Sequence, residues 1–240
     1  MHVPTGLKDT EIAKLSTSVD ALSPNPRHAR WAHLSLCVLD ATFSIGLRYN
    51  AVVVPVVRRY ARSQSLAPVL IEGPGLLEKV SPRENEQSLS QFLSSIGTIS
   101  DDDLATQLGS KNRTSSRGGI LKASASRQIA EVLVAAEVES LSDVAVLLAD
   151  AARTVRVEED LRRIAGGGSR GIRTSYLWML AGDDNHVKPD RHVLKWLGGV
   201  LGRQVSVTEA RSLLSAVAKE LQISPWSVDH AIWSKMTRRT

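Results

Sequence analysis

The sequence has little cysteine and few aromatic residues. Its 240 residues include one cysteine, Cys37, which excludes a disulfide framework, a cysteine-ligated zinc site and a four-cysteine iron–sulfur cluster. Aromatic residues are only 4% of the chain, so aliphatic side chains must fill the core. No apolar run reaches the roughly 18 residues of a membrane helix, and the start MHVPTGLKDTEIAK lacks the pattern of a signal peptide. We therefore expect a cytoplasmic protein (nucleoid-associated if prokaryotic) with no membrane partner.

Hydrophobic residues make up 42% of the chain, which is enough for a sizeable core. No stretch alternates apolar and polar residues between hairpin turns, as strands would. Apolar residues instead recur at three- and four-residue spacing, which predicts an all-α protein, with a polar and basic surface loop at 109–119. The expected helices are 31–44, 49–63, 74–80, 87–96, 102–108, 120–136, 140–152, 157–164, 172–181, 190–201, 207–221 and 224–237.

Charge is distributed unevenly along the chain. Residues 1–152 carry 15 Lys and Arg against 16 Asp and Glu, whereas residues 153–240 carry 15 against 9. The second segment is therefore net +6 within a chain of net +5. Such a basic segment suits a polyanionic partner, nucleic acid first, although it would also serve solubility without any partner.

The most unusual stretch is IAGGGSRGIRTSYLWMLAG, residues 164–182. A short helix ends there, four glycines fall within six residues, and an apolar helix follows. Backbone N–H groups in such a connection can point at a phosphate, and glycine lets a DNA backbone approach closely. A flexible loop between two packed helices is the alternative. The residues expected to contact the DNA backbone here are Gly166, Gly168, Arg170, Gly171, Arg173 and Thr174.

Asp190 follows this apolar helix after a short loop, in the segment VKPDRHV (187–193). The order of hairpin, apolar helix and aspartate resembles the helix-hairpin-helix and Gly-Pro-Asp superfamily of DNA base-excision glycosylases, which includes the 8-oxoguanine glycosylase-like fold. In that family the hairpin reads L-P-G-V-G-[KRS]-[KS]-T-A, and the aspartate segment reads V-[PD]-x-D-T-H-V-x-R. Residues 164–166 (IAG) and 171–175 (GIRTS) stand at the hairpin positions here.

Two upstream segments resemble the same family, so that the resemblance covers residues 34–200. Residues 34–60 are similar to its early helix pair, whose turn lies near the extruded base. Residues 119–123 (GILKA) are similar to the G-x-x-x-K-A that opens a middle helix. The resemblance implies two helical lobes with a cleft between them. These lobes would be a helical barrel of residues 31–182 and a second lobe of residues 1–30 with 183–240.

The resemblance implies a glycosylase that acts on double-stranded DNA and needs no cofactor, and no residues have the spacing of a metal site. Such an enzyme extrudes a nucleotide and uses a carboxylate to stabilise positive charge on the sugar. Asp190 would hold this role, at a helix N-terminus that favours the anion, and an ordinary N-cap is the alternative. His192 would reach a phosphate or pack. Candidates for the base pocket or wedge are Phe43, Ser44, Arg48 and Tyr49.

Two departures from the family pattern bear on the chemistry. The hairpin GGGSRG is longer than usual, and Arg173 stands at the position of the family's Schiff-base lysine. Because arginine is too basic to act as an amine nucleophile, we expect a monofunctional glycosylase without lyase activity. We also expect the protein to be a monomer. The alternatives are a member of this fold that binds DNA structure or damage without excision, and an all-helical interaction protein.

Overall fold

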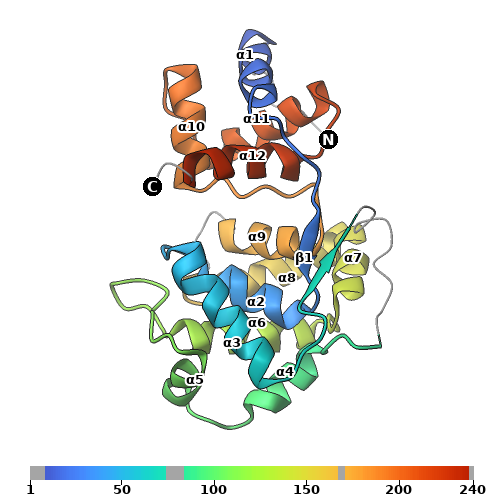
Figure 1. Cartoon of the computed structure of the whole chain (residues 1–240), viewed down its shortest axis with the longest axis vertical. Helices are drawn as coiled ribbons and strands as arrows, with labels where there is room; N and C mark the ends of the chain where they lie inside the picture. The colour runs from blue at the N-terminus through green and yellow to red at the C-terminus, as the bar shows by residue number, and fades with distance from the viewer. Residues whose placement is uncertain (1–8, 74–83, 167–170, 238–240) are drawn as a thin grey trace. The chain divides into compact units, whose positions relative to one another are not determined.

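The computed structural model describes residues 9–73, 84–166 and 171–237, and the protein is mostly helical (Figure 1). The expected helix at 74–80 lies outside these residues, as do Gly168 and Arg170. Contacts divide the chain into two compact units, Met1–Arg27 with Asp183–Thr240 (the smaller unit) and His28–Gly182 (the larger unit). The boundaries expected from the sequence fall after residues 30 and 182, and those of the structure fall after residues 27 and 182.

The larger unit contains a short antiparallel strand pair besides its helices. The strands β1 (Ala29–Trp31) and β2 (Leu70–Glu72) have three residues each, too few for a visible alternation of apolar and polar residues. The helices are α2 (Leu34–Phe43), the π-helix η1 (Tyr49–Val53), α3 (Val54–Ser63), α4 (Leu89–Ile96), α5 (Asp101–Leu108), α6 (Lys122–Ala135), α7 (Leu141–Ala149), α8 (Ala151–Arg163) and α9 (Ile172–Ala181).

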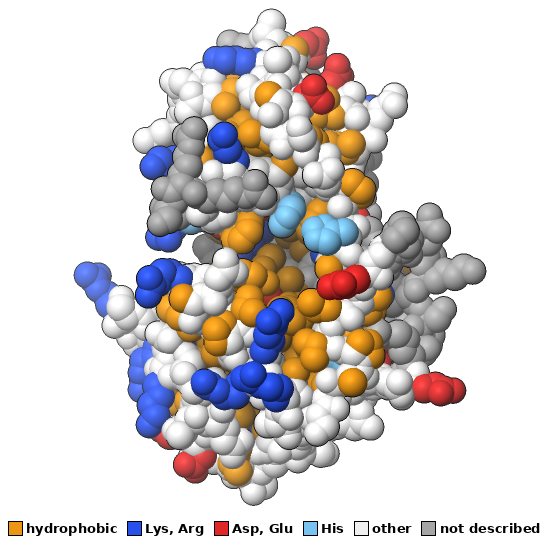
Figure 2. All heavy atoms as spheres, in the orientation of Figure 1, with side chains coloured by type: hydrophobic (Ala, Val, Ile, Leu, Met, Phe, Trp, Pro, Cys, Tyr) orange, Lys and Arg blue, Asp and Glu red, His pale blue; other side chains and the backbone are white. Residues whose placement is uncertain are grey.

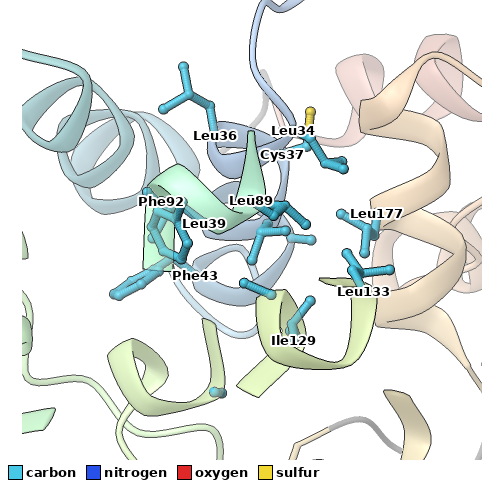
Figure 3. Packing of buried hydrophobic residues seen from close by; sticks show 14 of the residues in the cluster. Leu34, Leu36, Cys37, Leu39, Phe43, Leu89, Phe92, Ile129, Leu133 and Leu177 are labelled. Atoms are coloured by element: carbon cyan, nitrogen blue, oxygen red, sulfur yellow. The ribbon is translucent and has the colours of Figure 1, made fainter. Parts of the chain in front are cut away.

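Helix α2 forms the centre of the larger unit. All ten of its residues are buried, which explains the nearly unbroken apolar sequence LSLCVLDATF. It packs against α6 and α9, and Figure 3 shows Ile129 and Leu133 of α6 and Leu177 of α9 in the same cluster as its leucines. The following segment differs from the single helix expected at 49–63. A π-helical turn comes first, and α3 then starts next to Pro55, whose missing N–H is harmless in a first helical turn.

The described part of the smaller unit consists of four helices: α1 (Asp9–Asp20), α10 (Arg191–Leu201), α11 (Val207–Glu220) and α12 (Pro225–Thr237). Helix α1 was not expected, because its apolar residues are sparse. It buries Leu15 and Val19 in a cluster shared with the other three helices. The principal partners in this cluster are Val193, Leu197, Leu213, Leu214, Val217, Val228 and Ile232.

Side-chain caps fix several helix starts. Ser140 and Asp143 form a reciprocal capping box at α7, as their spacing predicts. Ser206 caps α11 by accepting a hydrogen bond from the backbone N–H of Glu209, the third residue of the helix. At α5 the cap is Ser100, and Asp101, Asp102 and Asp103 form the acidic first turn. Negative charge there complements the helix dipole.

Positive charge is present in both units. By sequence, the smaller unit carries 12 Lys and Arg against 9 Asp and Glu, and the larger unit carries 18 against 16. Figure 2 shows Lys and Arg side chains over both units. Within the described ranges, no helix is long and apolar enough to span a bilayer. The same residues contain no group of three or more His, Cys, Asp and Glu side chains that could hold a metal ion.

Candidate functional site

The glycine-rich motif lies in the connection between α8 and α9. Gly166 has a φ of +84° and Gly171 a φ of +62°, and both values fall in the left-handed region that favours glycine. Gly171 is the N-cap of α9, and no side chain of the described residues caps that helix. The first N–H groups of a helix lack partners within it, so the start of α9 presents donors and a positive dipole end to an anion.

Arg173 lies inside this connection and not on its surface. Its residue is 3% exposed, and its guanidinium donates hydrogen bonds to the carbonyl oxygens of Leu161 at 2.9 Å and Ala165 at 3.3 Å. These carbonyls lie at the C-terminal end of α8, where the helix dipole favours a cation. Burial lowers the pKa of Arg173 to about 10. The expected contact of Arg173 with a DNA phosphate is therefore corrected: the side chain joins α9 to α8.

Two further side chains of α9 face the protein interior. Thr174 was expected at the DNA backbone, but it is 3% exposed, and its Oγ1 has no hydrogen-bond partner among the described residues. Trp178 is fully buried and donates from Nε1 to the carboxylate of Glu158 on α8 at 3.0 Å. The first turn of α9 can therefore offer a ligand its backbone N–H groups, whereas these side chains hold the helix in place.

Asp190 is the N-cap of α10. Its Oδ1 accepts hydrogen bonds from the backbone N–H groups of His192 at 2.8 Å and Val193 at 3.2 Å. Among the described residues, these two N–H groups are the donors to the Asp190 carboxylate, and both donate to Oδ1. Oδ2 takes no part in the cap. The side chain is half-buried. His192 is also half-buried, and its Nε2 accepts a hydrogen bond from Nε of Arg191 at 3.4 Å.

A second carboxyl group in the same unit, Asp229 of α12, was missed by the sequence analysis. It is 4% exposed, and its Oδ2 accepts a hydrogen bond from the backbone N–H of Lys188 at 2.7 Å. This bond fastens the segment that leads to Asp190 onto α12. Burial raises the pKa of Asp229 to about 8; the Lys188 N–H opposes this rise, and the negative charge of Asp190 adds to it. Asp229 is therefore mostly protonated at neutral pH.

The four residues expected at a base pocket occupy different environments in the larger unit. Phe43 is fully buried in the core, as Figure 3 shows, so its ring is not available to stack on a base, and its expected role is corrected. Ser44 is half-buried at the C-cap of α2. Arg48 is exposed immediately before η1, and Tyr49 is the half-buried first residue of η1.

Tyr49 belongs to a polar cluster around Asp40, which is completely buried within α2. Oδ2 of Asp40 accepts hydrogen bonds from the Tyr49 hydroxyl at 2.7 Å and from Nε1 of Trp31 at 2.8 Å. Burial and the charge of Asp40 raise the pKa of Tyr49 and of Tyr176 on α9, so both phenols remain protonated. The hydroxyl of Tyr49 is thus fixed inward by Asp40.

Lys122 opens α6, at the lysine of the GILKA segment. It is 1% exposed, and its Nζ donates hydrogen bonds to the carbonyl oxygens of Thr42 at 2.8 Å and Ile45 at 2.9 Å. The ammonium group thereby satisfies carbonyls at the C-terminal end of α2. This lysine fixes the turn between α2 and η1, and it has a structural role here.

The residues of interest thus form three groups. Two lie in the larger unit, the α8–α9 connection and the Asp40 cluster, and one lies in the smaller unit around Asp190 and Asp229. No curated protein and no solved structure matches the chain. One family model matches residues 10–237, nearly the whole sequence. The chain therefore belongs to that family, which is described as Domain of unknown function (DUF8548).

Proposed function

We propose that the protein is a monofunctional DNA glycosylase that hydrolyses the N-glycosidic bond of a damaged or mismatched base in double-stranded DNA. The observation that carries the proposal is the position of Asp190. It caps α10 after an α8–glycine connection–α9 unit, which is the order of the glycosylase motifs that the sequence resembles. Its Oδ2 lies outside the cap and can interact with a substrate.

The proposed reaction needs the target nucleotide to leave the duplex, because its glycosidic carbon is inaccessible inside the stack. The C1′–N bond breaks and the base departs with the bonding electron pair. A water oxygen then bonds to C1′, and the proton that this water loses neutralises the departed base. The carboxylate of Asp190 would stabilise the positive charge that develops on the sugar and would orient this water. The free N–H groups at the start of α9 would hold a backbone phosphate.

The environment of Arg173 supports hydrolysis without a lyase step. A lyase reaction through an imine requires a primary amine that reaches C1′. The guanidinium at the corresponding position is buried and bonded to carbonyl oxygens of residues 161–165, so it has neither the chemistry nor the access for that step. The abasic product would therefore remain intact until alkali cleaves it.

The proposal is tested by single-turnover excision on duplexes that carry 8-oxoguanine, uracil, thymine mismatches, hypoxanthine or alkylated purines. Each product is treated with hot alkali, and Asp190→Asn is assayed beside the wild type. We expect alkali-dependent cleavage of one substrate and its loss in the variant, because asparagine still caps a helix but carries no negative charge. Full activity of Asp190→Asn would refute the assigned role of Asp190.

A DNA-binding protein without excision activity is the second candidate function. The observation that favours it is the N-cap geometry itself, because two backbone hydrogen bonds are a sufficient structural reason for an aspartate at position 190. This candidate predicts salt-sensitive binding to duplex DNA and no abasic product from any substrate in the panel. The excision assay, run together with a binding titration, separates the two functions.

A further inference from the structure

The loop between α5 and α6, residues 110–119, is folded into a defined turn. The backbone N–H of Thr114 donates to the carbonyl of Ile120 at 2.9 Å, and that of Lys122 donates to the carbonyl of Asn112 at 2.9 Å. Nη1 of Arg113 donates to the carbonyl of Gly119 at 2.9 Å, across the turn. A Cβ on Gly119 would lie only 2.3 Å from a backbone nitrogen of the same loop, so the turn closes tightly.

This loop concentrates uncompensated positive charge. Lys111, Arg113 and Arg117 lie within seven consecutive residues, the loop contains no Asp or Glu, and all three side chains are exposed. No described residue forms an ion pair with any of them. By contrast, Arg162 and Arg163 at the end of α8 each pair with an acidic residue of their own helix. Three like charges on one tight loop repel one another, and a polyanion would relieve that repulsion.

The loop lies directly against the glycine-rich connection. A Cβ built on Gly166 would come within 2.5 Å of the Cβ of Thr114, so the two turns touch at these residues. On its other side the loop follows α5, and Nη1 of Arg59 on α3 donates to the carbonyl of Leu108 at 3.0 Å. Figure 2 shows Lys and Arg side chains gathered where Figure 1 places α3 and this loop. Positive charge therefore lies beside Gly166, where the glycine-rich connection to α9 begins.

We propose that loop 110–119 is a second contact for the DNA backbone, in which Lys111, Arg113 and Arg117 bind phosphates next to the one held at the start of α9. The inference rests on the proposed function and names the part of the protein that supplies its affinity for duplex DNA. Phosphate contacts of this kind position a duplex without reading its sequence. The loop would therefore bind damaged and undamaged DNA alike, and the tightness of its turn would keep the cations in place.

The test is the salt dependence of binding to an undamaged fluorescent duplex, measured by anisotropy over a series of KCl concentrations. The variant is Lys111→Ala with Arg117→Ala, which leaves the structural hydrogen bond of Arg113 intact. The matched control is Arg156→Ala, an exposed arginine on α8. Each lost phosphate contact makes the negative slope of log Kobs against log salt shallower by about 0.9. We therefore expect the slope of the double variant to be shallower than that of the wild type by about 1.8. The control should keep the wild-type slope.

Excision by wild type and double variant is measured at saturating protein, which separates the loop from the chemistry. We expect the double variant to bind at least about 10-fold more weakly at low salt but to excise normally once saturated. If the double variant binds DNA as tightly as the wild type and with the same salt slope, the assignment of the loop is wrong. The role of Asp190 is unaffected by that result. A wild type that shows no salt-dependent binding to duplex DNA would overturn both proposals.

Discussion

Asp229 makes the stability of this protein depend on pH in a way that can be calculated. Its carboxyl group has a pKa of about 8 in the folded protein, against a usual value of 3.8. Between these two values the folded chain retains a proton that the unfolded chain has released. The free energy of unfolding must therefore fall as the pH rises from about 4 to about 8, and must level off above that range.

The size of this effect follows from the difference between the two pKa values. A difference of one pKa unit corresponds to about 1.4 kcal/mol for one proton. The difference of about four units therefore limits the fall in the free energy of unfolding to roughly 6 kcal/mol. Relaxation around a newly charged carboxylate reduces this figure, and we expect a loss of roughly 2 to 4 kcal/mol. An Asp229→Asn variant keeps an acceptor for the Lys188 N–H but cannot ionise. It should match the wild type at pH 4.5 and exceed its stability at pH 8.5.

The assay is urea unfolding of both proteins at pH 4.5, 6, 7 and 8.5, followed by circular dichroism. Titrating groups that do not interact with Asp229 cancel in the difference between wild type and variant, so the difference reports the titration of Asp229 together with its coupling to Asp190. Asp20→Asn, at the exposed end of α1, controls for the loss of one negative charge. A stability difference between wild type and Asp229→Asn that stays constant from pH 4.5 to 8.5 would refute the reasoning.

Two further predictions concern the larger unit. Lys122→Met should lower the free energy of unfolding by roughly 2 to 4 kcal/mol, because a buried carbonyl oxygen (Thr42) and a partly buried one (Ile45) lose their donor. A loss below about 0.5 kcal/mol in urea unfolding would contradict this role. Gly166→Ala should cost at least about 1 kcal/mol more than Gly118→Ala. Both glycines have a positive φ, but only at position 166 does the new Cβ meet another side chain, that of Thr114. Equal losses in thermal unfolding would show that the two turns do not touch.

Local signals in the sequence predict most of the helices but not the groups that depend on distant contacts. Helix α9 has the bounds expected from its apolar run and its flanking glycines, 172–181. The burial of Asp229 depends on residues 183–190, which fold against α12 and are separated from it by two helices in the chain. The only local hint was its place beside Val228 and one turn before Ile232, on the face of α12 that fills the core.

Arg173 shows why a motif position does not define a role. The glycines that precede it predict a surface turn, and in a surface turn an arginine would face solvent. Helix α8 changes this outcome, because it ends with carbonyl groups that lack partners within the helix, and a cation nearby is stabilised by them. The guanidinium turns inward to those carbonyls and gives up its access to DNA.

In the proposed function, this loss of access means that other groups must contact the phosphates. Within the described part of the connection, the backbone N–H groups at the start of α9 are the donors left for a phosphate, and they carry no net charge. The charge must then come from the adjacent loop 110–119, whose three exposed cations have no acidic partner among the described residues. The burial of Arg173 and the positive charge of loop 110–119 are thus complementary: the first removes a cation from the surface of the connection, and the second supplies cations beside it. Under the proposed function, Arg173 would provide rigidity, the loop would provide affinity for DNA, and the reaction would depend on Asp190.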